Sequence, residues 1–330
     1  MPMTSTEHQT PTNTAIFLYL APIQGVTEVV FRNLFSQHFP GFDAAMAPFI
    51  NPQGQANFKQ KVLADVLPEH NTGLPLIPQL LHNNAENFIA MAARLEDLGY
   101  SHINWNLGCP APMIVRKKRG SGLLPYPDAI ISFLEEVMPR IKAQLSIKTR
   151  LGLHEPSEIL DLLPRLDDFP LEEITIHARL GKQLYRGTTD LKGFAACQRQ
   201  TRHQLVYNGD IIDTAVFNDL SRRFPTVQRW MIGRGALSDP FLPAAIKGTE
   251  SFSGQEKRLR IMAFHDELYN EYRQRLFGPS HLLGRMKQLW AYLIFSFPGQ
   301  EKLLKKINKA SSEEQYQGLM TELQKMPQAE

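Results

Sequence analysis

The chain has 330 residues, of which 43% are hydrophobic and 21% charged, and it contains 2 cysteines. This composition excludes an intrinsically disordered chain, a collagen-like repeat and a small disulfide-stabilised scaffold. The length fits two domains, or one α/β barrel of about 250 residues with a further segment. The 36 Lys and Arg exceed the 33 Asp and Glu by three, and residues 251–330, with 12 basic and 9 acidic residues, contain the whole excess. Its position indicates an acidic partner for the last quarter of the chain.

The N-terminal residues 1–14 are polar and contain no Lys or Arg, which is typical of a disordered leader and not of a signal peptide. The longest uncharged apolar-rich stretch, residues 288–300, is interrupted by Pro298 and is shorter than the roughly 20 residues that span a bilayer. Cys109 and Cys197 do not have the spacing of a metal or redox motif. We therefore expect a cytoplasmic monomer with free thiols, without a bound metal or a membrane partner.

Short runs of β-branched and aliphatic residues alternate along the chain with amphipathic stretches of helical period. The eight runs lie at residues 16–21, 42–47, 75–81, 102–106, 145–150, 173–177, 204–208 and 228–232. Strand and helix alternating eight times predict an α/β fold with a parallel sheet closed into a (β/α)₈ TIM barrel. We place this barrel domain at residues 15–248.

The alternation ends after the barrel. From Gln255 onward there is no strand-like run, and apolar or aromatic residues from Leu259 to Leu276 recur at spacings of three and four. This pattern predicts a helix, and further helices are expected after Pro279 and after Pro298. The sequence therefore predicts a C-terminal all-helical domain at residues 249–330.

In a barrel of this kind, functional groups gather at the C-terminal ends of the strands, where the eight βα loops converge. Seven of the eight predicted strands end in residues that a barrel core does not require. In chain order these residues are Ala21 and Pro22, Gln79, Asn106, Lys148 and Arg150, His177 and Arg179, Asn208 with Gly209 and Asp210, and Gly233 with Arg234. Their concentration at one end of the barrel indicates a ligand site.

Glycine follows the seventh strand in Asn208-Gly209-Asp210 and the eighth in Gly233-Arg234-Gly235. In barrels, the loops after these two strands and a short helix N-terminus form a recurrent phosphate site, because backbone N–H groups and the helix dipole favour an anion. The second segment is not a dinucleotide fingerprint, since Ser238 stands where the third glycine would be. Its position in the fold therefore predicts a phosphate-binding cradle.

Four strand-end side chains can hold the rest of a phosphorylated ring system such as flavin mononucleotide, FMN. Lys148 and His177 supply charge and hydrogen bonds, and the amides of Gln79 and Asn106 can bond to the edge of the ring. Cys109 lies three residues past Asn106 on the loop after the fourth strand. A thiol above a flavin can serve either as a nucleophile or as a general acid.

Four consecutive cations follow this cysteine: Arg116, Lys117, Lys118 and Arg119. A basic run is usually a solvated surface. At the rim of a catalytic mouth it indicates a polyanionic substrate.

The sequence around Cys109 reads Ile103-Asn104-Trp105-Asn106-Leu107-Gly108-Cys109-Pro110, followed by Ile114 and by Gly120-Ser121. This spacing resembles the signature of the tRNA-dihydrouridine synthases of bacterial type. Further segments similar to that family lie at residues 20–27, 148–152, 208–210 and 233–236. The resemblance covers residues 16–247 motif by motif.

The resemblance implies FMN-dependent reduction of specific uridines in the tRNA D-loop to 5,6-dihydrouridine, with NADPH as the reductant. It implies hydride transfer from reduced FMN to C6 and proton transfer from Cys109 to C5 of a flipped-out uracil. The residues implied for FMN are Ala21, Pro22, Gln79, Asn106, Lys148, His177, Asn208, Gly209, Asp210, Gly233 and Arg234. Those expected at the tRNA are Arg116, Lys117, Lys118, Arg119, Arg179, Arg285 and Lys287. Residues 285–290 resemble the tail of the type that acts near the start of the D-loop.

Two alternatives remain open. An FMN barrel acting on a small molecule, similar to dihydroorotate dehydrogenase or an ene-reductase, would explain the flavin features but gives the basic helical tail no role. A barrel that binds RNA without turnover would not need Cys109, Lys148 and His177 together.

Overall fold

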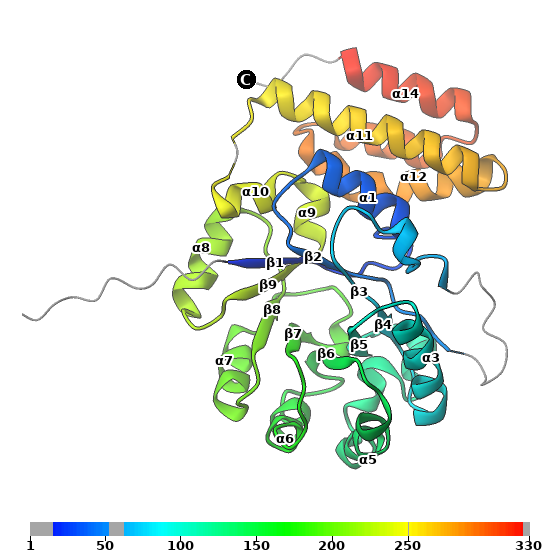
Figure 1. Cartoon of the computed structure of the whole chain (residues 1–330). Helices are drawn as coiled ribbons and strands as arrows, with labels where there is room; N and C mark the ends of the chain where they lie inside the picture. Colours follow the sequence, from blue (N-terminus) through cyan, green and yellow to red (C-terminus); the bar gives the residue numbers. More distant parts are fainter. Residues whose placement is uncertain (1–15, 53–62, 250, 326–330) are drawn as a thin grey trace, which may run out of the picture.

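The computed structural model describes residues 16–52, 63–249 and 251–325, so the predicted leader at 1–14 lies outside the described residues. Its strands form one sheet in the order β3-β2-β1-β9-β8-β7-β6-β5-β4. The two edge strands, β3 (Leu76–Ile77) and β4 (Gln79–Leu80), are consecutive in the chain. The sheet therefore closes on itself as an eight-stranded barrel, which confirms the predicted fold (Figure 1).

Pro78 divides the third predicted strand into β3 and β4. A proline has no N–H to donate to a neighbouring strand, although its carbonyl still accepts, here from the Asn104 N–H at 2.9 Å. The run predicted as one strand over 75–81 is thus two short strands on either side of the proline.

The other seven strands lie where the sequence predicts them, and all neighbours pair in parallel. They are β1 (Phe17–Leu20), β2 (Ala44–Met46), β5 (His102–Leu107), β6 (Gln144–Gly152), β7 (Ile174–Leu180), β8 (Leu205–Asn208) and β9 (Arg229–Ile232). The helices of the barrel are α1 (Val29–His38), α3 (Ala85–Asp97), α4 (Pro112–Val115), α5 (Pro127–Val137), α6 (Ser157–Leu166), α7 (Leu191–Gln200), α8 (Thr214–Arg223), α9 (Arg234–Ser238) and α10 (Leu242–Lys247).

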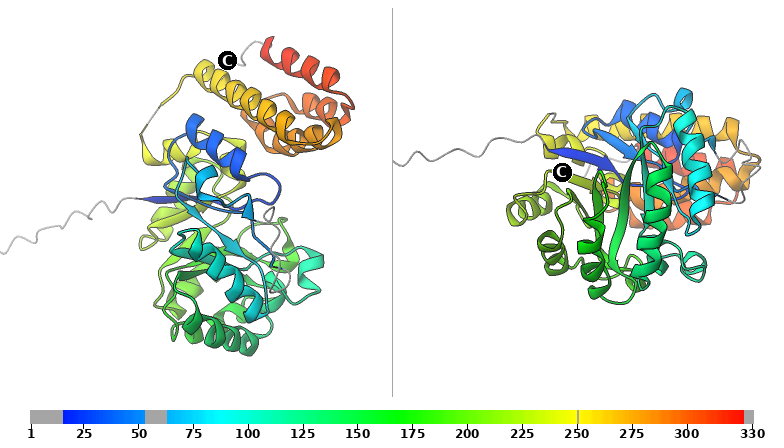
Figure 2. Two further views of the ribbon diagram at one scale, coloured as in Figure 1. Left: turned by 45° about the vertical axis from the view of Figure 1, so that its right-hand side comes forward. Right: turned by 60° about the horizontal axis from the view of Figure 1, so that its bottom comes forward.

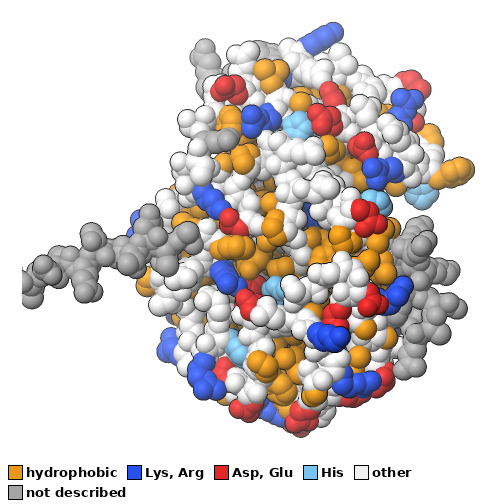
Figure 3. All heavy atoms as spheres, in the orientation of Figure 1, with side chains coloured by type: hydrophobic (Ala, Val, Ile, Leu, Met, Phe, Trp, Pro, Cys, Tyr) orange, Lys and Arg blue, Asp and Glu red, His pale blue; other side chains and the backbone are white. Residues whose placement is uncertain are grey.

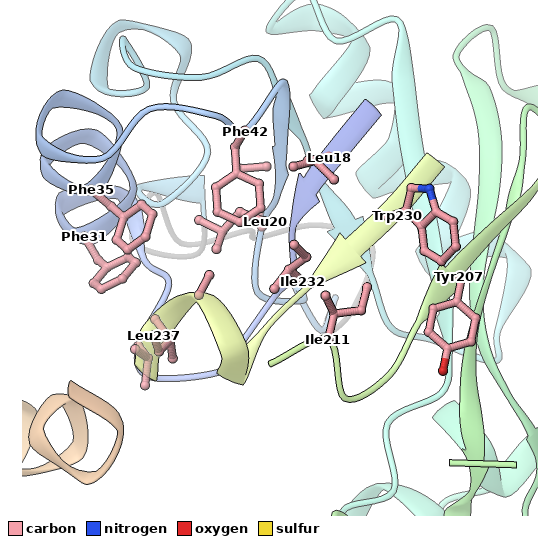
Figure 4. Packing of buried hydrophobic residues seen from close by; sticks show 14 of the residues in the cluster. Leu18, Leu20, Phe31, Phe35, Phe42, Tyr207, Ile211, Trp230, Ile232 and Leu237 are labelled. Atoms are coloured by element: carbon pink, nitrogen blue, oxygen red, sulfur yellow. The ribbon is translucent and has the colours of Figure 1, made fainter. Parts of the chain in front are cut away.

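Large apolar side chains fill the layer between the strands and the outer helices. Figure 4 shows Phe31 and Phe35 of α1 facing Leu20, and Trp230 beside Tyr207, whose ring centroids are 5.6 Å apart. These side chains are buried, and aromatic pairs of this kind contribute about 0.5–1.5 kcal/mol beyond their buried area. The core therefore fixes the strand ends on which the polar residues stand.

Four helices follow the barrel: α11 (Gly254–Arg275), α12 (Pro279–Leu293), α13 (Glu301–Lys309) and α14 (Glu313–Lys325). They lie against one side of the barrel, next to α1 (Figures 1 and 2). No helix within the described ranges is long and apolar enough to cross a membrane. We keep residues 15–248 and 249–330 as the proposed limits of two domains.

Phe264 of α11 joins the two parts. Its ring centroid lies 5.6 Å from that of Phe31 and 5.2 Å from that of Phe39 on the barrel side. The apolar face predicted for α11 began at Leu259, and this part of the prediction is wrong. Leu259 is 63% exposed, whereas Ile261 and Phe264 are buried. The face that packs on α1 is rotated away from Leu259.

Candidate active site

The C-terminal ends of β5 to β9 meet at one end of the barrel. Lys148 Nζ on β6 donates to Asn208 Oδ1 on β8 at 3.0 Å, and Asn208 Nδ2 donates to the carbonyl of Met231 on β9 at 2.8 Å. Residues that the sequence placed on separate strands are thus linked directly. Asn208 is 8% exposed, and it orients the Lys148 ammonium group.

Glycine is required where the loops after β8 and β9 approach each other. A Cβ on Gly235 would lie 1.9 Å from the carbonyl oxygen of Ile211, and a Cβ on Gly209, at φ +145°, would lie 2.7 Å from Thr189. A Cβ on Gly233 would approach the Ala21 side chain to 3.3 Å. The two glycine-containing segments therefore pack together beside the end of β1, with their backbone N–H groups at the same end of the barrel.

Asp210 joins two arginines at this end. Its Oδ1 accepts from Arg179 and from Arg234 at 2.9 Å each, and its Oδ2 accepts a second bond from Arg179. The Arg179 side chain is 2% exposed, and it also donates to the carbonyl of Gly187 at 2.7 Å. The structure thus places Arg179 inside the protein, where it fastens the loop after β7 to Asp210, and not on the surface where we expected it to meet RNA.

Lys148 and His177 lie in a cluster of cations. Burial and the neighbouring Arg150 lower the pKa of Lys148 to about 7. Burial and the charges of Lys148, Arg150 and Arg179 hold the pKa of His177 well below its ordinary value, so the imidazole is neutral at neutral pH. A cluster that lowers the proton affinity of its own members attracts an anionic ligand.

Cys109 is held by its backbone on both sides. Its N–H donates to Asn106 Oδ1 at 2.8 Å, and its carbonyl accepts from the Ser121 hydroxyl at 3.1 Å. Gly120, at φ +55°, allows this close approach, because a Cβ there would lie 2.6 Å from the Cys109 carbonyl oxygen. Burial raises the pKa of the thiol despite the lowering effect of Arg150. The thiol is therefore protonated at neutral pH, which favours a general acid over a thiolate nucleophile.

Gln79 lies beneath Asn106. Asn106 Nδ2 donates to Gln79 Oε1 at 2.7 Å, and Gln79 Nε2 donates to Asn104 Oδ1 at 2.8 Å. Asn106 is 8% exposed and Gln79 is 0% exposed. In this conformation Gln79 has no surface to offer to a ring, and it acts on the site through Asn106.

Three of the four consecutive rim cations are exposed: Arg116, Lys117 and Lys118. Arg119 instead donates to Asn51 at 2.9 Å and to Asn83 at 3.0 Å. Burial lowers the pKa of Arg119. Arg119 thus binds the rim loop to its neighbours, and because it is half-buried its contact with RNA stays a prediction.

Comparison with known proteins identifies the family. A model of the dihydrouridine synthase (Dus) family matches residues 19–329. The chain belongs to the dihydrouridine synthase family.

Similar proteins within the family have known names. The chain is 26% identical over 293 residues to the tRNA-dihydrouridine(16) synthase of Cupriavidus necator, covering 87% of this chain and 90% of that protein. It is 26% identical over 316 residues to the tRNA-dihydrouridine(16) synthase of Vibrio parahaemolyticus, covering 88% of this chain and 92% of that protein. Among solved structures, the old yellow enzyme homologue from Zymomonas mobilis matches at a TM-score of 0.53 and 11% identity, covering 72% of this chain and 89% of that one. This last likeness supports the barrel fold alone.

The two predicted tail contacts of this dihydrouridine synthase are engaged within the protein. Arg285 on α12 donates to the carbonyl of Gly25 and pairs with Glu28 at 2.8 Å. Lys287 Nζ donates to the carbonyl of Ala310 at 2.6 Å. Arg285 therefore ties the helical part to the loop after β1, and neither side chain stands free for RNA as we expected.

Exposed lysines remain on α13, where Lys302, Lys305 and Lys309 follow each other at spacings of three and four and so share one helix face. Figure 3 shows one face of the whole molecule, on which basic side chains lie in separate groups on the barrel and on the helical part. The charge excess of the tail is thus not one continuous patch on the face shown.

Two residues near the site had no assigned role: Arg150, which is one of the predicted strand-end residues, and Tyr185. Arg150 is 2% exposed. It donates to the carbonyls of Leu180 and Leu184 at 2.8 and 2.6 Å. Its guanidinium carbon lies 5.3 Å from the ring centroid of Tyr185, and that of Arg234 lies 5.8 Å from the same ring. Tyr185 is 58% exposed, so two arginines hold an aromatic ring at the mouth of the barrel. The strand-end rule indicated Arg150, and the family resemblance included Tyr185 without giving it a role.

Proposed function

We propose that this protein uses FMN and NADPH to reduce a uridine of tRNA to 5,6-dihydrouridine. The observation that carries the proposal is the position of Cys109, held through its backbone by Asn106 and Ser121 at the mouth of a barrel whose neighbouring strand ends form a cationic, glycine-lined cradle. The family to which the chain belongs and the names of its relatives support the same reaction. Its substrates place the reaction in the cytoplasm, and we propose that one copy of the chain suffices for it.

The residues present fit FMN. Backbone N–H groups of Gly209, Gly233 and Arg234 would suit the phosphate, because they lie after β8 and β9 at the start of the short helix α9, where N–H groups and the helix dipole favour an anion. Lys148 and His177 would hold the flavin from neighbouring strands. Ala21 and Pro22 would border the cradle beside Gly233, since Ala21 bonds to Ile232 at 2.9 Å. Asn208 and Asp210 would act through Lys148 and Arg234, and Asn106 would bond to the ring edge.

The residues of the chain supply the acid half of the reaction. Reduced FMN, when bound and recharged by NADPH, supplies the hydride that adds to C6 of the uracil. Cys109 gives its proton to C5, so that one hydride and one proton saturate the double bond and leave a thiolate. Arg150 and Lys148 stabilise that thiolate, as both lower the pKa of the thiol. Water then returns the proton to Cys109.

The test uses tRNA from a strain that lacks dihydrouridine. We expect NADPH oxidation to match the uridines lost, and the modified position to lie in the D-loop. We propose position 16, which the names of the relatives from Cupriavidus necator and Vibrio parahaemolyticus carry. Purified protein without a flavin spectrum, or NADPH oxidation that is stimulated by small enones and not by tRNA, would overturn the proposal in favour of the alternatives.

FMN binding is expected to weaken as the pH rises above 7. In the free protein Lys148 has a pKa of about 7, so above that pH it is mainly neutral. Binding of an anionic ligand must then be accompanied by the uptake of a proton from solution by Lys148. The affinity then falls by up to about tenfold per pH unit between pH 7.5 and 9.5. Titration calorimetry in buffers of different ionisation enthalpy measures the proton uptake. Lys148→Met should bind FMN more weakly and without this slope, and an equal slope in the variant would assign it to another group.

Charge reversal at the exposed rim is expected to weaken tRNA binding. The variant K117E/K118E should raise the Kd for tRNA about tenfold or more at low salt and flatten its salt dependence, because phosphate contacts are lost. Its FMN content should not change. The matched control K142E/R222E reverses two exposed charges beyond the opposite ends of the strands. Equal losses in both double variants, measured by filter binding, would show a non-specific charge effect and refute the rim assignment.

A further inference from the structure

A chain of hydrogen bonds runs from Cys109 into the barrel. The N–H groups of Gly108 and Cys109 donate to Asn106 Oδ1 at 3.0 and 2.8 Å. Asn106 donates to Gln79 at 2.7 Å, and Gln79 donates to Asn104 at 2.8 Å. Asn104 Nδ2 then donates to the Ser146 hydroxyl at 2.8 Å. Three side-chain amides and one hydroxyl therefore connect the cysteine loop to the interior of the barrel.

The period of the strands brings these residues together. Asn104 and Asn106 alternate along β5 and face the interior, and Asn104 stands opposite Gln79 of β4 and Ser146 of β6. Gln79, Asn104 and Ser146 are each 0% exposed. Buried amides that lose a partner cost about 1–3 kcal/mol each, so each link supports the next.

The chain has one direction. Backbone N–H groups only donate, so Asn106 must turn its oxygen toward Cys109 and its nitrogen toward Gln79. Gln79 must then turn its nitrogen toward Asn104, which in turn must turn its nitrogen toward Ser146. The backbone N–H groups of the cysteine loop thus set the direction of the chain, and the partners deeper in the barrel hold Asn106 in the orientation that this direction requires.

We propose that Asn104 and Ser146 are positioning residues for Cys109, which they hold in place through Gln79 and Asn106. This inference rests on the proposed role of Cys109 as the proton donor. Ser146 closes the chain, because its oxygen accepts from Asn104 and its own proton has two acceptors, His102 Nε2 at 2.8 Å and the carbonyl of Ile103 at 3.3 Å. Burial lowers the pKa of His102, so its imidazole is neutral at neutral pH, and in the tautomer with its proton on Nδ1 the Nε2 accepts from Ser146.

Four variants separate positioning from general destabilisation. Asn104→Leu and Ser146→Ala break the chain, whereas Asn104→Asp keeps oxygens that accept from Gln79 and from the Ser146 hydroxyl. Thr175→Val is the matched control: Thr175 is also 0% exposed in a neighbouring strand, and its hydroxyl has no hydrogen-bond partner among the described residues. Thermal unfolding of each variant reports its stability separately.

The first readout needs no tRNA. We expect iodoacetamide to alkylate Cys109, followed on its own peptide by mass spectrometry, at least threefold faster in N104L and S146A and within twofold of the wild-type rate in N104D and T175V. The apparent pKa of the thiol should fall toward its ordinary value in the first pair, since a loosened loop exposes it. If N104L does not fold, S146A and N104D carry the comparison. A Cys109 alkylation rate in folded S146A equal to that of the wild type would overturn the proposal, and so would a faster rate in T175V.

The second readout uses turnover. N104L and S146A should lower kcat per bound FMN at least tenfold with an unchanged KM for tRNA, and N104D should retain kcat. A change in KM alone would contradict positioning of the proton donor. If alkylation follows the expected pattern while the wild-type protein reduces no uridine, the proposed function fails and the positioning of Cys109 stands.

Discussion

Cys109→Ala is expected to lower kcat for uridine reduction by about 10²–10⁴-fold, the usual contribution of a general acid. Burial raises the pKa of the thiol, which is therefore protonated at neutral pH, and alanine has no proton to donate. FMN content should stay as in the wild type, because the cysteine is on the loop after β5 and not in the cradle formed after β8 and β9. Single-turnover reduction of tRNA by the pre-reduced enzyme measures the effect on the chemical step.

The other cysteine provides the control. Cys197 is 0% exposed in α7 and packs in the core, so Cys197→Ala should cost stability and retain kcat.

The wild-type rate should also fall as the pH rises through the raised pKa of Cys109, because the acid form is then lost. Full activity of C109A would rule out the proton-donor role.

Arg179→Met is expected to lower the free energy of unfolding by about 3 kcal/mol, since the substitution leaves Asp210 without its buried partner. The same change should reduce FMN retention, because Asp210 beside the cradle then keeps Arg234 alone of its two arginine partners. Chemical denaturation and flavin content after dialysis measure the two effects.

A surface ion pair gives the matched control. Arg222 pairs with Asp219 at 3.4 Å, with side chains 75% and 69% exposed, so Arg222→Met should change stability by less than about 0.5 kcal/mol. If R179M were as stable as R222M and kept its flavin, Arg179 would not be the structural residue that its burial indicates.

The barrel could be predicted because its signals are local. Each strand is a short run of β-branched and aliphatic residues, and each run recurs at the spacing of a strand–helix unit. The break at Pro78 is also a local effect, yet it was missed because the apolar run continues on both sides of the proline. The buried face of α11 could not be predicted from its own sequence, since it depends on which side of the helix packs against α1.

The basic residues show where sequence reasoning ends. Arg119, Arg179 and Arg285 are chemically the same as exposed rim cations, but each finds its partners 31 to 260 positions away, in Asn83, Asp210 and Gly25. Such partners are set by tertiary packing and have no local pattern. The predicted placement of Cys109 and the glycines depended instead on strand ends, where position follows directly from the fold.

The tie between Arg285 and the loop after β1 has a consequence for substrate selection. With Phe264 packed against Phe31 of α1 and Arg285 bound to Glu28, the helical part and the mouth of the barrel form one assembled surface, which we propose is the surface that meets the tRNA. Binding then does not have to order the two parts against each other, and more of the contact energy remains for affinity. If the proposed function holds, we expect the fixed separation between the helices and the mouth of the barrel to make the shape of the tRNA the main determinant of which nucleotide reaches Cys109.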